Sequence, residues 1–374
     1  MNIAIDARFI IPGRVEGYGT YTYEIFKILI RSNPSDKFYF LFDRETSNLF
    51  SSFDNVHQVT ITPAARHPLL WKYWYNYMVP PILKRVKADV FVCPNGFCSL
   101  RTKIPQLLVI HDLGFLHYAD FYKKSHALYY KRNTPAFIKK AELVLTVSQF
   151  SAEDLQKEYP FIKDKLKIVY NGVKDIFKPI SKNRQQEIKS HYTEGKEYFL
   201  YTGAIHPRKN LVNLLKAFSI FKKRLKSGMK LILVGRLAWK NNEFTELLRT
   251  YKFREDVIVT GYVTDEELVD LFGAAYAFVY PSFWEGFGIP VAESMKMQVP
   301  VLTTQHSAMS EVASDAALYF DPDSPTDIAD KLMKIYKDES ERYVLIEKGI
   351  KKSDAYTWQS SANEMWDCIK DIIK

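Results

Sequence analysis

Short apolar runs alternate with segments of helical spacing along the first half of the chain. The runs predict strands at 2–6, 38–42, 56–61, 88–93, 106–110, 143–147 and 167–170. Between them, residues 21–31 and 148–159 place apolar side chains three and four positions apart, as on one face of an amphipathic helix. Apolar strands that alternate with helices are typical of a parallel sheet that helices cover on both faces.

The same alternation resumes after a polar segment, residues 178–196, which we interpret as a linker with a short helix. Further strands are predicted at 198–203, 231–235, 257–260, 277–280, 299–303 and 317–320, and helices at 211–225, 266–274, 291–297, 327–336 and 362–373. The pattern predicts an α/β fold of two doubly wound, Rossmann-like domains, residues 1–177 and 178–357, facing each other across a cleft. Because Trp358 and Trp366 flank an amphipathic segment, we expect residues 358–374 to form a helix that crosses back to the first domain.

Composition is ordinary for a globular protein, but charge is not evenly spread. The 374 residues are 25% charged and 47% hydrophobic, which allows two domains with a core each. The net charge of +9 comes from the first half: residues 1–180 hold 25 basic and 16 acidic side chains, and residues 181–374 hold 27 of each. A basic half predicts an anionic partner, such as a phosphate, a nucleic acid or a membrane surface.

Cysteine usage and hydropathy bear on the compartment. Cys93, Cys98 and Cys368 are an odd count without a second pair for a zinc site, which fits a reducing cytoplasm. No stretch reaches 18 uncharged apolar residues, so no membrane span is predicted. We therefore expect a cytoplasmic protein, and peripheral contact with the inner face of an anionic membrane is one explanation of its basic half.

The most informative spacing follows the predicted strand at 277–280. Glu285 and Glu293 are separated by seven residues, and Gly286 and Gly288 between them predict a tight loop before a helix. Glycines let backbone N–H groups approach an anion, and a helix N-terminus adds the positive end of its dipole. In the first turn of that helix, the Glu293 carboxylate is placed to accept hydrogen bonds from a diol such as ribose. A glycine turn with two solvated acids is the structural alternative.

A second loop follows the predicted strand at 198–203. Gly203 ends that strand, and Arg208 and Lys209 precede the next helix. The guanidinium fork of an arginine can bind two phosphate oxygens, and a lysine adds a point charge. We therefore predict a phosphate-binding loop, against the alternative of a solvated basic helix cap.

Two loops of the first half are further candidates. Gly17 and Gly19 lie between the first strand and the first helix, but the third glycine and the acidic residue of a dinucleotide fingerprint are missing. We interpret this pair as a place where the backbone approaches a phosphate or a sugar. His111, beside Asp112, follows a strand at the edge of the sheet where α/β proteins bind ligands.

Taken in order, these loops resemble the GT-B glycosyltransferases of family 4, which are retaining and use nucleotide sugars. The resemblance covers nearly the whole chain and is densest at 147–155, 170–173, 206–210, 261–268, 280–293 and 319–322. It implies a hexosyltransferase whose co-substrate is a nucleotide-diphosphate sugar. It also implies no cofactor and no metal, because cations of the protein neutralise the leaving group.

The resemblance further implies roles for single residues. Arg208 and Lys209 would bind the diphosphate, Glu293 would bind the ribose hydroxyls, and Glu285 would hold hydroxyls of the donor sugar. The implied donor-binding set is Gly17, Gly19, Gly203, Arg208, Lys209, Gly235, Tyr262, Val263, Glu285, Gly286, Phe287, Gly288, Ile289 and Glu293. The residues implied in catalysis are His111, Arg208, Lys209 and Glu285.

An aromatic stripe marks the first half. Trp71, Trp74, Tyr75 and Met78 recur at helical spacing and are followed by a basic stretch. One interpretation is a helix packed on the core. The other is an aromatic face for an acceptor, either a glycan or a lipid-linked glycan. On the second interpretation Trp71, Trp74 and Tyr75 are acceptor-side residues.

Our leading interpretation is a retaining hexosyltransferase of cell-surface polysaccharide synthesis. Overall resemblance to bacterial mannosyltransferases favours GDP-mannose as the donor, and a UDP-hexose is the alternative. A nucleotide-sugar epimerase would share two doubly wound domains, but the two-glutamate spacing argues against it. A basic module that binds a membrane or nucleic acid without catalysis would leave the neutral half without a role, and we expect no nucleic-acid partner.

Two loops depart from the family pattern. Met297 and Gln298 stand where the family usually has a small residue and a glycine before its proline, which predicts a less tight loop. Residues 304–311 replace a commoner loop rich in asparagine and serine, which bears on contacts near the donor.

Overall fold

The computed structural model describes residues 1–11, 17–46, 50, 52–237 and 242–373. They form two compact units, Met1–Gly172 with Thr357–Lys374, and Val173–Tyr356. The boundary between the two units lies at 172/173, five residues before the domain boundary that the sequence predicted. Phe177 accordingly belongs to the second unit, where its ring packs on Phe272 with centroids 5.9 Å apart. Among the described residues, no helix is long and apolar enough to cross a membrane.

The described part of the first unit contains a parallel sheet of seven strands in the order β3-β2-β1-β4-β5-β6-β7. In the central register, Ile3 lies between Phe38 and Val90. The strands are β1 (Asn2–Asp6), β2 (Lys37–Phe42), β3 (Val56–Thr60), β4 (Val90–Cys93), β5 (Gln106–Val109), β6 (Leu143–Thr146) and β7 (Leu166–Ile168). Every residue of β4 and β5 is buried, as expected for strands covered on both faces.

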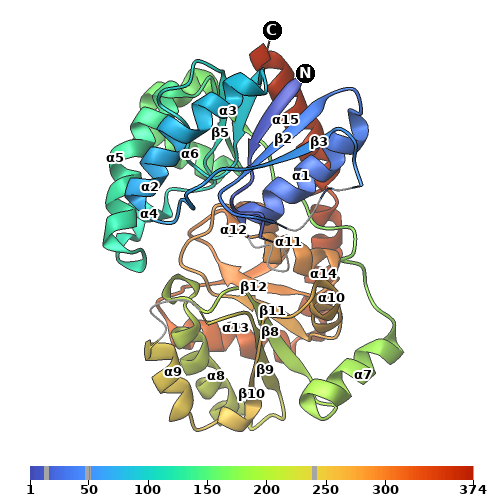
Figure 1. Ribbon diagram of the computed structural model, residues 1–374. Helices are drawn as coiled ribbons and strands as arrows, with labels where there is room; N and C mark the ends of the chain where they lie inside the picture. Colours follow the sequence, from blue (N-terminus) through green and yellow to red (C-terminus); the bar gives the residue numbers. More distant parts are fainter. Residues whose placement is uncertain (12–16, 47–49, 51, 238–241, 374) are drawn as a thin grey trace. The chain divides into compact units, whose positions relative to one another are not determined.

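Helices cover both faces of this sheet (Figure 1). They are α1 (Tyr18–Ser32), α2 (Pro68–Tyr73), η1 (Trp74–Met78), α3 (Val79–Arg85), α4 (Gly114–His117), η2 (Ala119–Phe121), α5 (Lys124–Lys140), α6 (Gln149–Glu158), η3 (Pro160–Lys165) and α15 (Trp358–Ile373). The last helix, α15, packs against α1. A Cβ on Gly172 would lie 2.1 Å from the backbone nitrogen of Trp358, the first residue of α15. Only glycine therefore fits at position 172.

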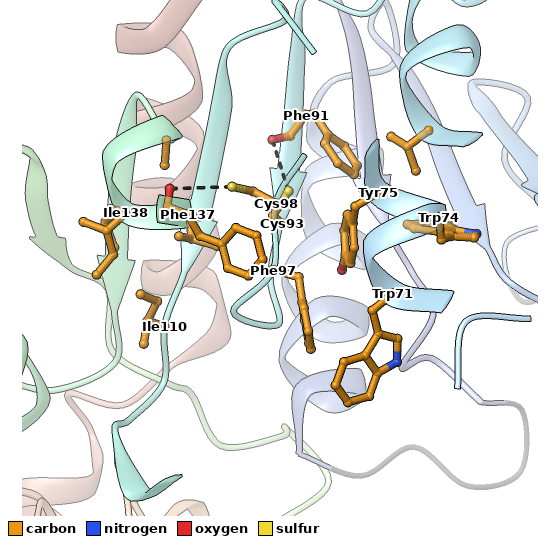
Figure 2. Packing of buried hydrophobic residues seen from close by; sticks show 14 of the residues in the cluster. Trp71, Trp74, Tyr75, Phe91, Cys93, Phe97, Cys98, Ile110, Phe137 and Ile138 are labelled. Carbon is orange, nitrogen blue, oxygen red and sulfur yellow. Dashed lines mark hydrogen bonds between the residues drawn. The ribbon is translucent and has the colours of Figure 1, made fainter. Parts of the chain in front are cut away.

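The core of the first unit is rich in aromatic rings (Figure 2). Phe97 is stacked on Tyr75, with centroids 5.5 Å apart, and meets Trp71 edge-on at 5.2 Å. Cys93 and Cys98 lie buried in the same cluster as free thiols. Burial raises the pKa of both thiols, which keeps them protonated and unreactive.

The described part of the second unit contains a parallel sheet of six strands in the order β10-β9-β8-β11-β12-β13. The strands are β8 (Tyr198–Thr202), β9 (Lys230–Val234), β10 (Val257–Gly261), β11 (Ala277–Tyr280), β12 (Val301–Thr304) and β13 (Ala317–Phe320). The helices are α7 (Lys182–Thr193), η4 (Pro207–Lys209), α8 (Leu211–Leu225), α9 (Asn242–Arg249), η5 (Arg254–Asp256), α10 (Asp265–Gly273), α11 (Ile289–Lys296), α12 (Met309–Ala313), α13 (Pro325–Lys337) and α14 (Glu339–Ser353). The α/β class and doubly wound topology predicted from the sequence are confirmed.

One local prediction was wrong. The turn at 297–300 is tight, because Gln298 adopts the left-handed conformation that a glycine would supply, with φ of 60°. Its N–H donates to the carbonyl of Met295, and the N–H of Val299 donates to the carbonyl of Ser294. The chain therefore closes this turn with a residue other than glycine and accepts the resulting backbone strain.

Candidate active site

The two loops that carry the clearest predicted site residues come from adjacent strands of the second unit. The sheet order places β8 beside β11, at the point where the order of strands reverses. Doubly wound sheets bind ligands at this switch point, beyond the carboxyl ends of the strands. Residues 203–209 follow β8 and residues 281–288 follow β11. Topology therefore brings the two motifs together.

Close backbone approach requires glycine at the ends of β8 and β9. Gly203 and Gly235 have φ of 136° and 141°. A Cβ on Gly235 would lie 2.0 Å from the carbonyl oxygen of Gly203. The N–H of Gly203 donates to the carbonyl of Val234 (2.9 Å), and the N–H of Gly235 donates to that of Gly261 (2.8 Å). Three neighbouring strand ends thus present backbone without side chains, which lets a ligand approach closely.

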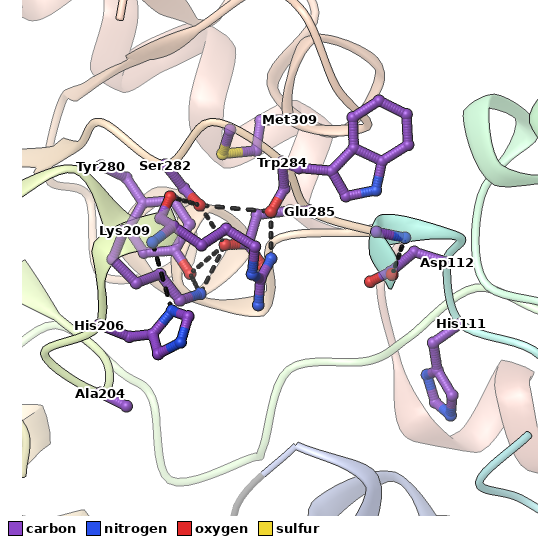
Figure 3. A network of polar contacts seen from close by, with 12 residues as sticks. His111, Asp112, Ala204, His206, Lys209, Tyr280, Ser282, Trp284, Glu285 and Met309 are labelled. Atoms are coloured by element: carbon purple, nitrogen blue, oxygen red, sulfur yellow. Dashed lines mark hydrogen bonds and ion pairs between the residues drawn. The ribbon is translucent and has the colours of Figure 1, made fainter. Parts of the chain in front are cut away.

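Glu285 is the centre of a polar network in the loop after β11 (Figure 3). Lys209 donates to its Oε1 and to the hydroxyl of Tyr280, with the Nζ–hydroxyl distance 2.6 Å. The hydroxyl of Ser282 also donates to Oε1. Arg208 completes the network, with Nη1 3.3 Å from Oε2. The predicted pair of cations and the first glutamate of the motif therefore contact one another directly.

These partners decide the charge of Glu285, which is only 8% exposed. Burial by itself would raise the pKa of its carboxyl. The charges of Arg208 and Lys209, with hydrogen bonds from Lys209 and Ser282, outweigh burial and lower that pKa to about 2. Glu285 is a carboxylate at neutral pH, so the two cations exceed it by one positive charge. That excess attracts an anionic ligand.

A capped turn holds the two cations in place. Nδ1 of His206 accepts a hydrogen bond from the N–H of Arg208 (3.2 Å), and Asn210 closes the turn with φ of 60°. The Asn210 side chain donates to the carbonyl of Pro322 after β13 (2.7 Å). Arg208 Nη1 donates to the carbonyl of Trp284 after β11. Loops from three strands therefore fix the directions of the cationic side chains.

Glu293 is the fifth residue of α11, just past the first turn where the sequence placed it. Gly288 caps that helix with φ of 93°, and a Cβ there would lie 3.0 Å from Cγ of Met309. The Glu293 side chain is 8% exposed. No hydrogen bond or ion pair joins its carboxylate to another residue that the structure describes. Its carboxyl oxygens are therefore open to hydroxyl donors of a ligand.

The surroundings of Glu293 favour its neutral form. Burial raises the pKa of its carboxyl to about 8. The nearby ion pair of Lys174 and Asp265, 2.7 Å long, acts in both directions: the lysine lowers that pKa and the aspartate raises it. The two glutamates of one motif thus have pKa values on opposite sides of neutrality. Opposed pKa values in one site are typical of functional carboxyls.

The remaining predicted donor residues lie around these loops. Phe287 is buried, and its ring meets Tyr356 edge-on at 5.2 Å, so its side chain belongs to the core. Gly286 is buried beside it, and Ile289 begins α11. Tyr262 follows the end of β10 and is 53% exposed. Val263 beside it is half-buried.

In the first unit, His111 follows β5 and packs against two tyrosines. The centroids of Tyr18 and Tyr21 lie 4.7 and 4.8 Å from its ring. Its Nε2 lies 2.9 Å from the carbonyl oxygen of Pro94. Burial lowers the pKa of His111 to about 4, against the opposing effects of that hydrogen bond and of Asp112. The ring is therefore neutral at pH 7, with Nε2–H as the donor to Pro94.

The other candidates of the first unit have mixed surroundings. Gly17 caps α1 with φ of 49° and is exposed, whereas Gly19, the second residue of that helix, is buried. Residues 12–16 of the same loop lie outside the described residues. Oδ1 of Asp112 accepts a hydrogen bond from the N–H of Gly114 (2.8 Å), the first residue of α4, which holds this acid beside the start of the helix.

The aromatic stripe is a core feature. Trp71, Trp74 and Tyr75 are 7%, 0% and 1% exposed, and Trp74 donates from Nε1 to the carbonyl of Ile61 (3.2 Å). Arg8 donates to the hydroxyl of Tyr75 inside the same cluster (Figure 2 shows the three rings). The structure thus contradicts the exposed acceptor face. Helical spacing alone does not distinguish a face that packs on the core from one that meets a ligand.

The described residues contain no cluster of metal-ligating side chains. No group of three or more His, Cys, Asp and Glu side chains among them is placed to hold a metal ion. Asp321 and Asp323 have the spacing of an Asp-x-Asp motif. There, Oδ1 of Asp321 accepts a hydrogen bond from the N–H of Asp323 (2.9 Å) in a turn after β13.

Sequence reasoning missed three contributors to the site. Tyr280 and Ser282 bind Glu285, and both stood inside the recognised motif, where hydroxyls beside a predicted carboxylate were a usable signal. Lys174, which lies near the start of the second unit, influences the pKa of Glu293. Lys174 and Glu293 lie far apart in the sequence, so no sequence motif could have linked them.

Two family models match the chain. The model described as "Glycosyltransferase Family 4" matches residues 17–175, and the model described as "Glycosyl transferases group 1" matches residues 183–352. The chain belongs to the family 4 glycosyltransferases. This membership confirms the family that the motifs predicted, and with it an enzyme that transfers a glycosyl group.

Relatives of this glycosyltransferase include two bacterial enzymes of similar length. The O-antigen chain mannosyltransferase B of Escherichia coli is 27% identical over 289 residues, which cover 77% of this chain and 76% of the relative. The O-antigen chain mannosyltransferase RfbU of Salmonella typhimurium is 28% identical over 273 residues, which cover 72% and 71%.

Solved structures confirm the GT-B fold of the glycosyltransferase. WaaG, a glycosyltransferase involved in lipopolysaccharide biosynthesis, superposes with a TM-score of 0.77 at 18% identity, over 99% of both chains. The sucrose-phosphate synthase of Thermosynechococcus elongatus superposes with a TM-score of 0.79 at 16% identity, over 99% of this chain and 98% of the other.

Proposed function

We propose that this glycosyltransferase is a retaining, metal-independent hexosyltransferase that uses a nucleotide-diphosphate sugar. The observation that carries the proposal is the contact of Arg208 and Lys209 with Glu285 at the switch point of the second unit. When the anomeric bond breaks, the sugar becomes oxocarbenium-like and the diphosphate becomes more negative. Cations that are already in place stabilise that negative charge without the reorganisation that solvent would need.

The residue roles follow the chemistry of each group. Arg208 and Lys209 would hold the diphosphate, and the buried carboxyl of Glu293 would accept hydrogen bonds from the ribose hydroxyls. Glu285 would orient hydroxyls of the donor sugar, and His111, neutral at pH 7, would approach that sugar as a hydrogen-bonding group. The further donor contacts would be Gly17, Gly19, Gly203, Gly235, Tyr262, Val263, Gly286, Phe287, Gly288 and Ile289.

We infer GDP-mannose as the donor and a glycan of the O-antigen type, free or lipid-linked, as the acceptor. The support is that E. coli and Salmonella relatives at 27% and 28% identity are named O-antigen mannosyltransferases. A UDP-hexose is the second candidate donor. It is favoured by the fold similarity to Anabaena HepE, solved with UDP and glucose, which has a TM-score of 0.77 at 14% identity.

We also propose that the first unit touches an anionic membrane at the inner face. The segment from α2 to η1 exposes apolar and aromatic side chains: Leu69 is 74% exposed, Tyr73 45% and Tyr77 51%. The guanidinium of Arg101 lies over the ring of Tyr77, 4.5 Å from its centroid. Basic and aromatic side chains together suit an interface of anionic headgroups. Co-sedimentation with phosphatidylglycerol vesicles should fall in Leu69→Ser/Tyr77→Ser.

Product analysis tests the proposed reaction. The full chain is incubated with GDP-mannose or UDP-glucose and a mannose-terminated oligosaccharide, in EDTA, and the new anomeric signal is read by NMR. We expect an α-linked mannose, since the sugar of GDP-mannose is α-linked. Glu293→Ala should abolish the product, and Glu266→Ala, at an exposed position of α10, should retain it. A β-linked product would exclude retention, and synthesis that survives Glu293→Ala would exclude the donor site.

A further inference from the structure

A pocket of about 50 Å³ lies beside His111 in the first unit, and the donor site does not account for it. Its lining includes the aromatic rings of Tyr18, Phe115, Tyr122 and Tyr130, and Asn95 and Asp112 are among its polar side chains. It opens at the carboxyl ends of β4 and β5, next to the histidine that we place at the donor sugar.

Ring packing and a buried hydrogen bond fix the side chains that line the pocket. Phe115 and Tyr130 pack on each other with ring centroids 5.3 Å apart. Asn95 is 3% exposed, and its amide nitrogen donates to Oδ2 of Asp6 (2.8 Å), which fixes the orientation of the side chain. Gly96 lines the pocket with φ of 82°, and no atom lies within 4 Å of where its Cβ would be. The lining is therefore a preformed surface with open space in front of a bare backbone.

The charge of the lining is the informative feature. Within the described chain, no lysine or arginine lines the pocket, and Asp112 is its formally charged group. His111 is neutral at pH 7, and burial raises the pKa of Tyr130 to about 12, so its phenol is neutral as well. An anionic group would meet the Asp112 carboxylate, with no lysine or arginine among the described lining residues beside it. The basic excess of the first half, which led us to expect an anionic partner, does not extend into this pocket.

Aromatic faces combined with hydrogen-bonding oxygens suit a neutral sugar, whose C–H face packs on a ring while its hydroxyls donate to carboxylate and amide oxygens. The pocket is too small to enclose a hexose, so it would receive one edge of the ring. We propose that this pocket binds the terminal, uncharged hexose of the acceptor, with Tyr122 as a stacking face and Asp112 as an acceptor for its hydroxyls. This assignment rests on the proposed transferase function.

Saturation-transfer NMR on the full chain with GDP tests the assignment. The probes are the methyl α-glycosides of mannose, glucose, galactose and N-acetylglucosamine, together with mannose 6-phosphate. We expect saturation of at least one neutral glycoside by the wild-type protein, a decrease of at least fivefold in Tyr122→Ala, and recovery in Tyr122→Phe. Tyr343→Ala, at a position of α14 that is 61% exposed, is the control and should keep the full signal. Mannose 6-phosphate should show little saturation.

Any one of three results would contradict the assignment of this pocket to the acceptor sugar. They are no saturation of any glycoside, an unchanged signal in Tyr122→Ala, or equal saturation of mannose 6-phosphate. The melting temperature with and without GDP is measured on the same samples. If neither GDP nor, in a parallel sample, UDP stabilises the wild-type protein, the transferase proposal itself fails. If GDP stabilises all variants but the glycoside signal does not depend on Tyr122, only the acceptor pocket is wrong.

Discussion

Lys209 donates hydrogen bonds to the hydroxyl of Tyr280 and to the carboxylate of Glu285, so a cation proposed to bind phosphate is already bonded to an anion of its own site. The pair keeps the ammonium group in position before any ligand arrives. A diphosphate oxygen would take over one of these contacts. That exchange would leave Glu285 freer to accept from sugar hydroxyls, which couples the binding of the phosphates to the binding of the sugar.

Removing this cation should weaken nucleotide binding. In Lys209→Met, we expect the affinity for GDP to fall at least tenfold, because a charge-assisted hydrogen bond to phosphate contributes about 1.5–3 kcal/mol. Titration calorimetry measures the change. Lys223→Met, at an exposed position in the last turn of α8, is the matched control and should bind GDP like the wild type. Equal affinities in the two variants would show that Lys209 does not contact the ligand.

The pKa of Glu293 predicts a pH-dependent stability. Between the ordinary carboxyl pKa of 4.5 and about 8, the native state keeps a proton that the unfolded chain has lost. The contribution of this group to the free energy of unfolding therefore falls as pH rises through that window, by a few kcal/mol at most, and is constant above it. Urea unfolding at pH 5.5 and 8.5 should show that Glu293→Gln gains stability over the wild type at the higher pH.

The exposed Glu266→Gln is the control for this measurement and should follow the wild type at both pH values. A parallel pH dependence of wild type and Glu293→Gln would contradict the raised pKa. Nucleotide binding offers an independent check. If ribose hydroxyls donate to the Glu293 carboxylate, GDP binding at pH 7 should release a proton, which calorimetry in buffers of different ionisation enthalpy detects.

Gly235 should tolerate no side chain. In Gly235→Ala, the new Cβ would overlap the carbonyl oxygen of Gly203, and φ of 141° would be strained as well. We expect a loss of at least about 3 kcal/mol in the free energy of unfolding, or failure to fold, with loss of GDP binding. Gly228→Ala is the control, because its Cβ would meet only the flexible side chain of Lys196, at 3.6 Å. A folded Gly235→Ala of normal stability would refute the contact.

Replacing Gln298 by glycine should stabilise the protein. Gln298 has φ of 60°, and its side chain is exposed, so a glycine would relieve the backbone without removing a packed group. We expect Gln298→Gly to raise the free energy of unfolding by about 0.5–1 kcal/mol, seen as a higher urea midpoint at constant slope. A lower midpoint would mean that the side chain makes a contribution that its exposure conceals.

The sequence predicted the fold well because its signals were local. Apolar strands and the glycines after them are spaced within single βα units, and the reversal of strand order follows from doubly wound topology. The pairing of Arg208 and Lys209 with Glu285 was therefore within reach, since both loops belong to neighbouring strands. Polar surface helices such as α5 and α14 were missed, because charged side chains interrupt their apolar spacing.

What could not be predicted depends on packing between distant segments. Trp71 has the spacing of either a core face or a ligand face, and only its neighbours, such as Phe97, decide between the two. The raised pKa of Glu293 likewise reflects burial, which no motif encodes. The acceptor pocket is a third example, because Asn95 and Tyr130 meet only when the sheet and α5 are assembled.

The central claim is that the second unit binds a nucleoside diphosphate through Arg208 and Lys209. Calorimetric titration of GDP and GMP into the full chain tests it most directly, because GMP lacks the phosphate that these cations would neutralise. We predict one GDP site per chain and an affinity for GMP that is at least tenfold weaker. Equal affinities for GDP and GMP, or no binding of either GDP or UDP, would contradict the account.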